Sequence, residues 1–404
     1  METLVFSEKG NELRGRVPGS KSIAARALVL SRVFGGRTEV RDLPDCDDTR
    51  ELTAAMRAMA EGADSYNLGT GGTSLRFFTA LAASTPGFIG KIDCSEALRR
   101  RPFAPLVDAL CQAGADIEYL GEEGRAPIFV RGKILDGSGV FVDTSISSQF
   151  LSALLMTEPL WSAPMTHRPW EDADPSQVVS IPYVRMTERL IEMFRQLPEV
   201  FRVEGDWSAA SYFYELALAR PDLDVLVEGL VPPAESLQGD ARCDEIFSRL
   251  GVRSEFVGDR LLRLRADRGA VHYTAEHPFL IDMEKTPDLV MAVVAGCCFA
   301  GIPFKVTGVG NLRFKECDRL SAMEQELSKL NFTLHATPDT ISSESSSLTS
   351  SLVPRPFSSH GDHRMAMSMA IAAALIPEGI QMTGADDVSK SFPDFYTQFK
   401  IVKS

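Results

Sequence analysis

Apolar residues recur every three or four positions in five stretches of the chain, and each stretch ends in a break followed by an extended run. This pattern is typical of a helix that leads into a strand. The five stretches are residues 47–68, 101–120, 183–205, 240–259 and 315–339. A sixth, residues 390–402, predicts a final helix without a following strand. The recurrence at roughly 55 to 80 residues favours stacked copies of one α/β unit, although any α/β protein produces some alternation.

Two polar segments interrupt this pattern. Residues 342–351, "SSESSSLTSS", carry too little apolar surface to order themselves, so they are predicted to form a flexible surface loop. Residues 169–177, "PWEDADPSQ", are expected to form a second exposed loop on the basis of composition.

The bulk composition narrows the class of protein. A chain of 404 residues has room for two or three domains, and its net charge of −13 argues against a general nucleic-acid-binding surface. The longest apolar run, residues 289–302, is too short to span a bilayer, and the first residues lack the pattern of a secretory signal. Seven cysteines without a C-x-x-C pair argue against a disulfide framework. We therefore expect a reduced, cytoplasmic protein without membrane contact, and a catalytic thiol remains open.

Polar clusters precede several of the predicted helices. The first is "VPGSKSIAAR", residues 17–26, which places Ser20, Lys21 and Ser22 at a helix start. Free N–H groups and the helix dipole favour an anion at such a position. Arg26 follows Ser22 by one turn and lies on the same face. The spacing of a P-loop is missing, which argues against ATP.

Two more clusters lie in the same half of the chain. The glycine-rich turn "LGTGGTSLRF", residues 68–77, would let the backbone approach a ligand closely, but it lacks the spacing of a dinucleotide site. The segment "TSISSQFLSALLM", residues 144–156, places Ser147, Ser148 and Gln149 at the head of an apolar helix. One such start is ordinary capping, whereas several together point to anion binding.

Further clusters supply cations and carboxylates. Arg101, in "RRRPF", directly precedes a predicted helix. In "GNLRFKECDRL", Lys315 and Arg319 are four residues apart and are expected to point the same way from a helix start. The remaining clusters are Asp362, His363 and Arg364 in "GDHRMAMSMAIAAAL", Lys390 in "KSFPDF" and Asp288 in "DMEKTPDLVMAVV".

If these helix starts face one space, their cations form a positive pocket inside an acidic protein. The seven cations are Lys21, Arg26, Arg101, Lys315, Arg319, Arg364 and Lys390. Such a pocket fits a ligand with several negative charges, since each phosphate adds roughly −1.5 to −2. Asp288 and Glu316 do not help to bind an anion there, so their place among the cations suggests proton transfer.

Taken together, "PGSKS", "SSQFLSALLM", "NLRFKECDRL", "DHRMAM" and "KSFPDF" make the chain resemble the 5-enolpyruvylshikimate-3-phosphate synthase family nearly from end to end. The resemblance implies an α/β fold of two similar domains, each made of three βαβαββ units in an inside-out α/β barrel. One domain would comprise residues 1–19 plus 205–404 and the other residues 20–204, with the active site in a cleft between them. The chain crossings are expected near Ser20 and near residues 204–206.

The resemblance also implies a reaction of the shikimate pathway. The enolpyruvyl group of phosphoenolpyruvate passes to the 5-hydroxyl of shikimate 3-phosphate by addition and elimination, and phosphate is released. No metal and no cofactor is expected, and the protein is expected to act as a monomer. Glyphosate, a mimic of phosphoenolpyruvate, is an expected inhibitor because Gly72 is retained.

Site residues follow from the resemblance by motif position. Catalytic roles fall to Lys21, Asp288, Glu316 and Lys390, with Asp288 as the acceptor of the hydroxyl proton. Which of Lys21 and Glu316 protonates the methylene carbon stays open. The shikimate 3-phosphate contacts would be Ser22, Arg26, Ser147, Ser148, Gln149, Ser180, Tyr183, Asp288, Asn311 and Lys315. The phosphoenolpyruvate contacts would be Lys21, Gly72, Arg101, Gln149, Arg319, Arg364 and Lys390.

The chain departs from the family pattern at four places. Residues 70–73 read Thr-Gly-Gly-Thr where Asn-Ala-Gly-Thr is usual, which puts a threonine where the usual asparagine contact would be. Phe77 replaces the usual proline, and residues 24–25 are Ala-Ala instead of Ser-Asn. The chain between Phe194 and Val203 is short, so one repeat is expected to lack much of a strand pair.

Two alternatives remain at this stage. UDP-N-acetylglucosamine enolpyruvyl transferase has the same architecture, but its S-G-A-K-N start and its reactive cysteine loop are not visible here. A non-catalytic homologue could keep the anion pocket alone, and the retained Lys21, Asp288, Glu316 and Lys390 argue against it.

Overall fold

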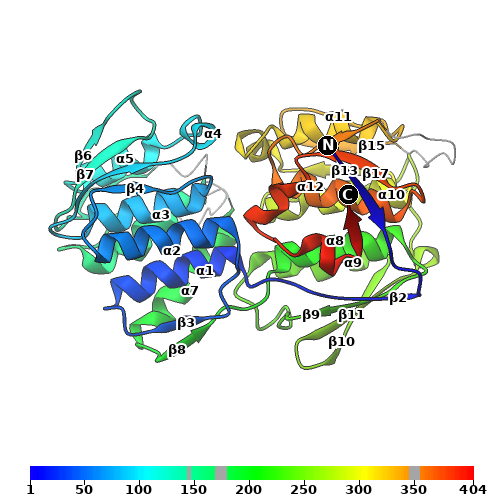
Figure 1. Ribbon diagram of the computed structural model, residues 1–404, viewed down its shortest axis with the longest axis horizontal. Helices are drawn as coiled ribbons and strands as arrows, with labels where there is room; N and C mark the ends of the chain where they lie inside the picture. The colour runs from blue at the N-terminus through cyan, green and yellow to red at the C-terminus, as the bar shows by residue number, and fades with distance from the viewer. Residues whose placement is uncertain (143–146, 169–179, 345–354) are drawn as a thin grey trace. The chain divides into compact units, whose positions relative to one another are not determined.

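The computed structural model describes residues 1–142, 147–168, 180–344 and 355–404. Its internal contacts divide the chain into two compact units (Figure 1). Unit 1 contains Met1–Pro18 and Glu204–Ser404, and unit 2 contains Gly19–Val203.

Unit 1 has three four-stranded sheets in its described residues. The first has the order β16 (Phe357–Ser358), β17 (Ile380–Thr383), β1 (Glu2–Phe6) and β18 (Ile401–Lys403). The second has the order β2 (Glu12–Arg16), β9 (Asp224–Glu228), β11 (Leu261–Ala266) and β10 (Val252–Gly258). The third has the order β12 (Phe279–Asp282), β13 (Phe304–Thr307), β15 (Thr340–Ser343) and β14 (His335–Ala336). In each sheet the first pair is parallel and the next two pairs are antiparallel.

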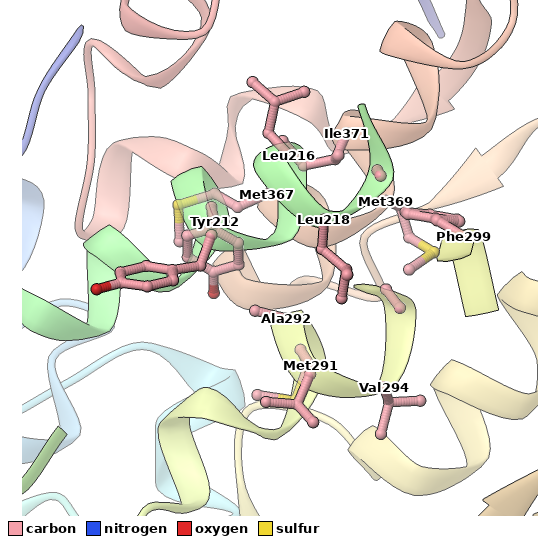
Figure 2. Close-up of a cluster of buried hydrophobic side chains, with 14 of the residues drawn as sticks. Tyr212, Leu216, Leu218, Met291, Ala292, Val294, Phe299, Met367, Met369 and Ile371 are labelled. Carbon is pink, nitrogen blue, oxygen red and sulfur yellow. The ribbon is translucent and has the colours of Figure 1, made fainter. Parts of the chain in front are cut away.

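Helices form the interior of unit 1. These are α8 (Trp207–Ala219), α10 (Val290–Ala300) and α12 (His363–Ala370), and nearly all their residues are buried. Because α10 is apolar on every side, it can only lie inside the unit. Figure 2 shows side chains of these helices packed together, among them Tyr212, Met291 and Met369. The sheets therefore surround buried helices, as an inside-out α/β barrel requires.

Shorter helices connect the strands of unit 1. The α-helices are α9 (Cys243–Arg249), α11 (Arg319–Ser328) and α13 (Phe395–Gln398). The 3-10 helices are η3 (Gly239–Arg242), η4 (Arg268–Ala270), η5 (Pro287–Leu289), η6 (Gly310–Phe314), η7 (Ile371–Ala374) and η8 (Ala385–Lys390).

One sheet of unit 2 has the same strand arrangement as the three sheets of unit 1. The order is β4 (Ser65–Asn67), β5 (Ile89–Asp93), β7 (Ile128–Arg131) and β6 (Asp116–Tyr119), again with one parallel and two antiparallel pairs. A second sheet pairs only β3 (Glu39–Arg41) with β8 (Val200–Arg202) in the described residues. Its helices are α1 (Lys21–Val33), α2 (Asp47–Ala60), α3 (Gly72–Ala83), α4 (Glu96–Arg99), α5 (Ala104–Gln112), α6 (Ser148–Thr157), α7 (Ile181–Arg195) and the 3-10 helix η1 (Glu158–Leu160).

The structure confirms the predicted repeat. Five helices lead into strands as expected: α2 into β4, α5 into β6, α7 into β8, α9 into β10 and α11 into β14. The four larger sheets share one strand order, which is the signature of a βαβαββ unit. Between Phe194 and Val203 the chain forms only the three-residue β8, as a shortened repeat requires.

The expectation for the end of the chain was wrong. Residues 390–402 form only one helical turn, α13, and the strand β18 follows it. This strand pairs with β1 at the opposite end of the sequence, with Val5 opposite Val402. The helix therefore does have its strand, and the long-range pairing completes the first sheet.

Two loop predictions fall mostly outside the described residues. Residues 345–351 of the serine-rich segment and all of residues 169–177 lie there. The first two residues of the serine-rich segment, Ser342 and Ser343, belong to β15, so the loop prediction was wrong at these positions. Ser343 is buried and pairs with Phe304 of β13, and its hydroxyl donates a hydrogen bond to the carbonyl oxygen of Thr333 at 2.9 Å.

All seven cysteines are free, which agrees with the expectation that the chain has no disulfide framework. Within the described ranges, no helix is both long enough and apolar enough to cross a bilayer.

Candidate active site

Three helix starts in unit 2 carry the predicted polar residues. Lys21 begins α1, Gly72 begins α3 and Ser148 begins α6. Ser147 caps α6, because its hydroxyl oxygen accepts a hydrogen bond from the N–H of Gln149 at 3.3 Å. The sequence therefore located these helix starts correctly.

Lys21 forms an ion pair with an acidic residue of α2. Its Nζ lies 2.9 Å from Oδ2 of Asp48, and the side chains are only 16% and 5% exposed. The second oxygen of Asp48 is buried and has no hydrogen-bond partner among the described residues. It lies against the glycine turn, where a Cβ added to Gly71 would be 3.2 Å away. The sequence pattern pointed to Lys21 but not to Asp48.

Glu51, one turn after Asp48, packs against the same glycine turn. A Cβ at Gly69 would lie 1.7 Å from Oε1 of Glu51, so a larger residue would displace the Glu51 carboxylate. Gly69 also has φ of +50°, which glycine adopts readily. Burial, together with the nearby negative charge of Asp48, raises the pKa of Glu51 to about 7. A carboxyl that titrates near neutrality therefore adjoins the turn.

Gly72 brings several predicted residues together. A Cβ at this position would lie 3.0 Å from Nη1 of both Arg76 and Arg101, so a larger residue would press on two guanidinium groups. Arg76 donates from Nη1 to Oε1 of Gln149 at 2.6 Å, and Nε2 of Gln149 donates to Oγ1 of Thr73 at 2.9 Å. The start of α3 thus lies close to Arg101, and it is linked to Gln149 through Arg76, a residue to which the sequence motifs gave no role.

Arg26 joins other predicted residues of unit 2. It donates from Nε to Oγ1 of Thr187 at 2.8 Å, and from Nη1 to the carbonyl oxygen of Ser22 at 2.9 Å. Its Nη2 lies 3.3 Å from Oγ of Ser152 and 3.4 Å from the carbonyl oxygen of Tyr183. Burial lowers the pKa of Arg26 to about 10. Among the residues that the structure describes, no carboxylate pairs with Arg26.

Ser180 has an unusual backbone at the start of α7. It is the residue before the helix, and its φ of 57° and ψ of 47° lie in the left-handed region. Residues other than glycine rarely adopt this conformation, and such strain is often found at functional sites. Its side chain is buried and makes no capping hydrogen bond, so its role is not that of an ordinary cap.

Unit 1 contains a compact network of carboxylates and cations centred on Arg319. The guanidinium of Arg319 contacts Oδ2 of Asp362 at 2.7 Å, Oδ1 of Asp288 at 3.3 Å and Oε2 of Glu316 at 3.0 Å. Burial by itself lowers the pKa of Arg319, but the three carboxylates outweigh burial and raise it. Arg319 is therefore held firmly as a cation.

Two more cations complete this network. Nη2 of Arg364 lies 2.7 Å from Oδ2 of Asp288, and Nζ of Lys390 lies 2.9 Å from Oε1 of Glu316. Asp288 therefore bridges Arg319 and Arg364, while Glu316 bridges Arg319 and Lys390. The structure brings together five of the predicted residues within unit 1.

Two expectations about helix starts in unit 1 were wrong. Lys315 has an extended backbone and lies outside α11, because Asp318 caps the helix and Arg319 is its first residue. Lys315 and Arg319 therefore do not share a helix face. Lys390 ends the 3-10 helix η8 instead of starting the final helix.

Asn311 has a side-chain oxygen that could accept a hydrogen bond from a ligand. It lies in η6, and its Oδ1 is buried without a hydrogen-bond partner among the described residues. Buried amide oxygens normally accept a hydrogen bond, so this atom is suited to a ligand donor.

Comparison with known proteins decides the family. The sequence profile described as EPSP synthase (3-phosphoshikimate 1-carboxyvinyltransferase) matches residues 8–66, 58–196 and 195–399. The chain belongs to the EPSP synthase family. It is 35% identical over 404 residues to a 3-phosphoshikimate 1-carboxyvinyltransferase of Bacteroides fragilis, covering 95% of this chain and 94% of the relative. It is 34% identical over 426 residues to the enzyme of the same description from Syntrophobacter fumaroxidans, covering 96% of each.

The fold agrees with solved structures of the EPSP synthase family. The EPSP synthase of Acinetobacter baumannii superimposes with a TM-score of 0.69 and covers 100% of both chains, at 20% sequence identity. At that identity the match establishes the fold alone. The resemblance seen in the sequence is thereby confirmed for the family and for the fold class.

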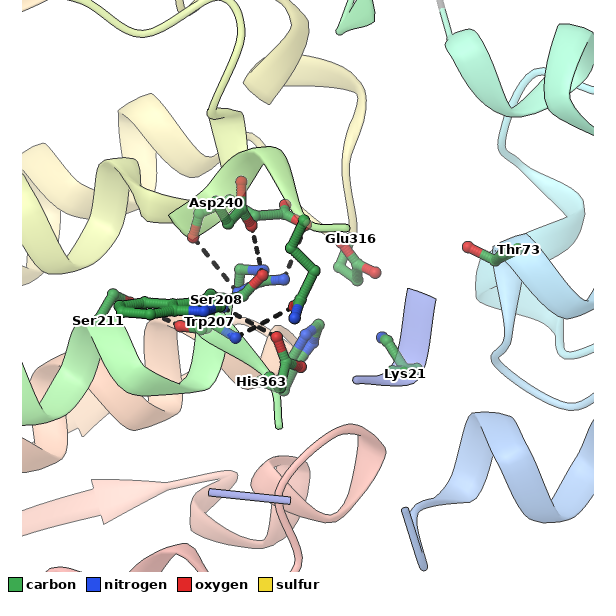
Figure 3. A network of polar contacts seen from close by, with 12 residues as sticks. Lys21, Thr73, Trp207, Ser208, Ser211, Asp240, Glu316 and His363 are labelled. Atoms are coloured by element: carbon green, nitrogen blue, oxygen red, sulfur yellow. Dashed lines mark hydrogen bonds and ion pairs between the residues drawn. The ribbon is translucent and has the colours of Figure 1, made fainter. Parts of the chain in front are cut away.

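The family resemblance did not point to Asp240. This residue is fully buried beside α8 and accepts a hydrogen bond from the hydroxyl of Ser208 (Figure 3). Burial, reinforced by the negative charge of Asp288, raises the pKa of Asp240 to about 7. Asp240 lies in a short helical turn before α9 with no motif around it, so the sequence carried little signal for it.

The thiols of this EPSP synthase family member are not poised for nucleophilic chemistry. The pKa of every one of the seven cysteines is raised, and burial is the main cause in each case. A nucleophilic cysteine needs the opposite shift, because the thiolate is the reactive form. The structure therefore disfavours the catalytic thiol that the sequence left open.

Proposed function

We propose that the protein transfers the enolpyruvyl group of phosphoenolpyruvate to the 5-hydroxyl of shikimate 3-phosphate and releases phosphate. The observation that carries this proposal is the network of unit 1, in which Asp288 and Glu316 are held between Arg319, Arg364 and Lys390. It combines groups for proton transfer with cations for a phosphate. The family membership agrees with this chemistry.

The reaction needs two proton transfers at each stage. In the addition, the hydroxyl oxygen bonds to C2 of phosphoenolpyruvate and loses its proton, and the methylene carbon gains one. In the elimination, the new methyl group loses a proton while the C–O bond to phosphate breaks and the phosphate gains one. We assign the hydroxyl proton to Asp288, and Glu316 and Lys21 serve the methyl carbon and the leaving phosphate. Fixed cations around the phosphate stabilise the charge that develops on it.

Unit 2 would supply most contacts to shikimate 3-phosphate. Two features support this: the buried charge of Arg26, and the polar helix start at Ser147. In unit 1, the open acceptor of Asn311 supports a contact with a substrate hydroxyl. The full proposed set is Ser22, Arg26, Ser147, Ser148, Gln149, Ser180, Tyr183, Asp288, Asn311 and Lys315.

The phosphoenolpyruvate contacts would come from residues of both units. Gly72 supports this role, because its lack of a side chain leaves room beside Arg101. The full proposed set is Lys21, Gly72, Arg101, Gln149, Arg319, Arg364 and Lys390. We further propose that glyphosate inhibits the enzyme at this position, and undiminished turnover in millimolar glyphosate would contradict that.

Three further expectations belong to this proposal: a monomer, a cytoplasmic location, and a substrate cleft between the two units. The seven free cysteines agree with a reducing compartment. The alternative transfer to a UDP-sugar is not favoured, because it relies on a reactive cysteine and every thiol here has a raised pKa.

The decisive experiment measures phosphate release from purified protein given both substrates. We expect release only when shikimate 3-phosphate and phosphoenolpyruvate are present together. Release with a UDP-sugar in place of shikimate 3-phosphate would favour the alternative enzyme. Binding of both compounds without release would favour a non-catalytic homologue.

A further inference from the structure

Arg26 carries its positive charge in the interior of unit 2, where only about 1% of its surface is exposed. Within the described part of the chain, its donors reach only neutral oxygens, namely the hydroxyls of Ser152 and Thr187 and the carbonyls of Ser22 and Tyr183. A buried charge without a counter-ion costs free energy unless other groups compensate. Any further interaction that favours the charged guanidinium would therefore offset part of this cost.

Two aromatic rings lie within cation–π distance of Arg26. Its Cζ is 5.1 Å from the centre of the Phe77 ring and 6.0 Å from the centre of the Tyr183 ring. Phe77 has no exposed surface, so water does not weaken the attraction between its ring and the cation. The Phe77 ring is the nearer of the two and belongs to α3, a helix that packs against α1.

The position of Phe77 on α3 links it to the neighbouring site residues. Arg76, the preceding residue, donates to Oε1 of Gln149 at 2.6 Å. One dipeptide of α3 thus orients Gln149 through Arg76 and supports Arg26 through Phe77. Any shift of this helix would disturb both groups together.

We propose that Phe77 is a positioning residue for the shikimate 3-phosphate side of the site. Its ring stabilises the guanidinium of Arg26 as a cation and fixes its plane before the ligand arrives. The inference rests on the proposed function, which makes shikimate 3-phosphate the anion that Arg26 meets. Leucine at position 77 would fill much of the same volume but would offer no π face.

The test compares Phe77→Leu with Phe78→Leu. Phe78 is the adjacent residue of α3 and is equally buried, but its ring packs on Tyr66, with centroids 5.1 Å apart, and on Phe88, with centroids 6.2 Å apart. The measurements are the calorimetric Kd for shikimate 3-phosphate, kcat, both KM values and Tm. Both substitutions are expected to lower Tm, because both remove buried ring contacts.

Only Phe77→Leu is expected to change ligand binding. It should raise the Kd and KM for shikimate 3-phosphate roughly tenfold, the range of a desolvated cation–π contact. Its kcat and its KM for phosphoenolpyruvate should stay within about twofold of the wild-type values. Phe78→Leu should leave the Kd for shikimate 3-phosphate unchanged. If Phe77→Leu does not fold, Phe77→Met tests the same point.

A double-mutant cycle separates positioning from packing. In an Arg26→Met background, Phe77→Leu should have no further effect on the Kd for shikimate 3-phosphate. An active wild type with an unchanged Kd in Phe77→Leu would overturn this inference alone. A wild type that neither binds shikimate 3-phosphate nor releases phosphate would overturn the proposed function and this inference with it.

Discussion

Arg26 of unit 2 and Arg319 of unit 1 are both about 1% exposed, but their surroundings differ in kind. Arg26 has neutral partners, and burial lowers its pKa to about 10. Arg319 contacts three carboxylates, which raise its pKa despite burial. The charge of Arg319 is therefore balanced before any ligand binds, whereas that of Arg26 is not.

This difference has a consequence for ligand binding. Because no carboxylate of the described residues pairs with Arg26, an anion that reached it would compete with none of them. An anion that reaches Arg319, Arg364 or Lys390 must share them with Asp288, Glu316 and Asp362. On the proposed function, we therefore expect an incoming anion to be attracted to Arg26, and we expect the cations of the unit 1 network to hold Asp288 and Glu316 in place for proton transfer.

The largest effect on turnover is expected when Lys21 is substituted. Unlike Arg26, this cation of unit 2 has a carboxylate partner, Asp48. Lys21→Met should lower kcat about a thousandfold, because both a cation and a proton carrier are lost. The protein should still fold, with a modest fall in Tm because Asp48 loses its ion pair. Activity assays and thermal unfolding check both points.

The control for this substitution is Arg32→Met. Arg32 belongs to the same helix, α1, and its side chain is exposed, so this variant also removes one positive charge from α1. Its kcat should stay within about twofold of the wild-type value, because an exposed charge far along the helix adds little. An equal loss of kcat in both variants would contradict a specific role for Lys21.

Asp288→Ala should separate turnover from binding. Turnover should fall about a hundredfold or more through loss of the proton acceptor. The KM for phosphoenolpyruvate should change less than about threefold, because Arg319 and Arg364 lose a competing carboxylate. Steady-state kinetics would contradict this role for Asp288 if both quantities worsened to the same extent.

The two buried arginines should differ in what they contribute to stability. Arg319→Met should cost about 3–5 kcal/mol of unfolding free energy, because it leaves the buried carboxylate of Asp362 without its arginine partner. Arg26→Met should cost only about 1–2 kcal/mol, since Thr187 and Ser152 keep a mutual hydrogen bond of 3.0 Å. Denaturant unfolding measures both values, and equal costs would remove the contrast between the two sites.

The smallest expected effect is a change in how Tm depends on pH, and it concerns Glu51. A carboxyl whose pKa rises on folding favours the native state at low pH, and this contribution is lost as pH rises from 4.5 to about 7. Glu51→Gln should remove that loss, so its Tm relative to wild type should increase between about pH 5 and pH 8. A Tm difference that stays constant over this range would show that Glu51 does not titrate there.

Local features of the fold were predictable from the sequence. The helix starts at Lys21, Gly72 and Ser148 depend on turn residues, caps and apolar spacing, all of which lie within a few positions. The helix–strand repeat was visible for the same reason. The strand β18 was missed because its partner β1 lies at the other end of the chain.

The candidate site was predictable only in part. The motifs named the cations, but some of the carboxylates that pair with them come from distant positions, as Asp362 does with Arg319. Burial, which gives Arg26 and Asp240 their shifted pKa values, depends on packing that no local pattern encodes. Lys315 was misplaced because Asp318 caps α11 and so starts the helix later than the charge spacing suggested.

The most direct test of the contrast between the units is calorimetry with each substrate alone. Shikimate 3-phosphate should bind the wild-type protein without phosphoenolpyruvate, and Arg26→Met should weaken that binding about tenfold or more, equivalent to about 1.4 kcal/mol. Phosphoenolpyruvate alone should bind more weakly than shikimate 3-phosphate. Unchanged binding of shikimate 3-phosphate to Arg26→Met would contradict the account, because the buried charge of Arg26 would then contribute nothing to the ligand.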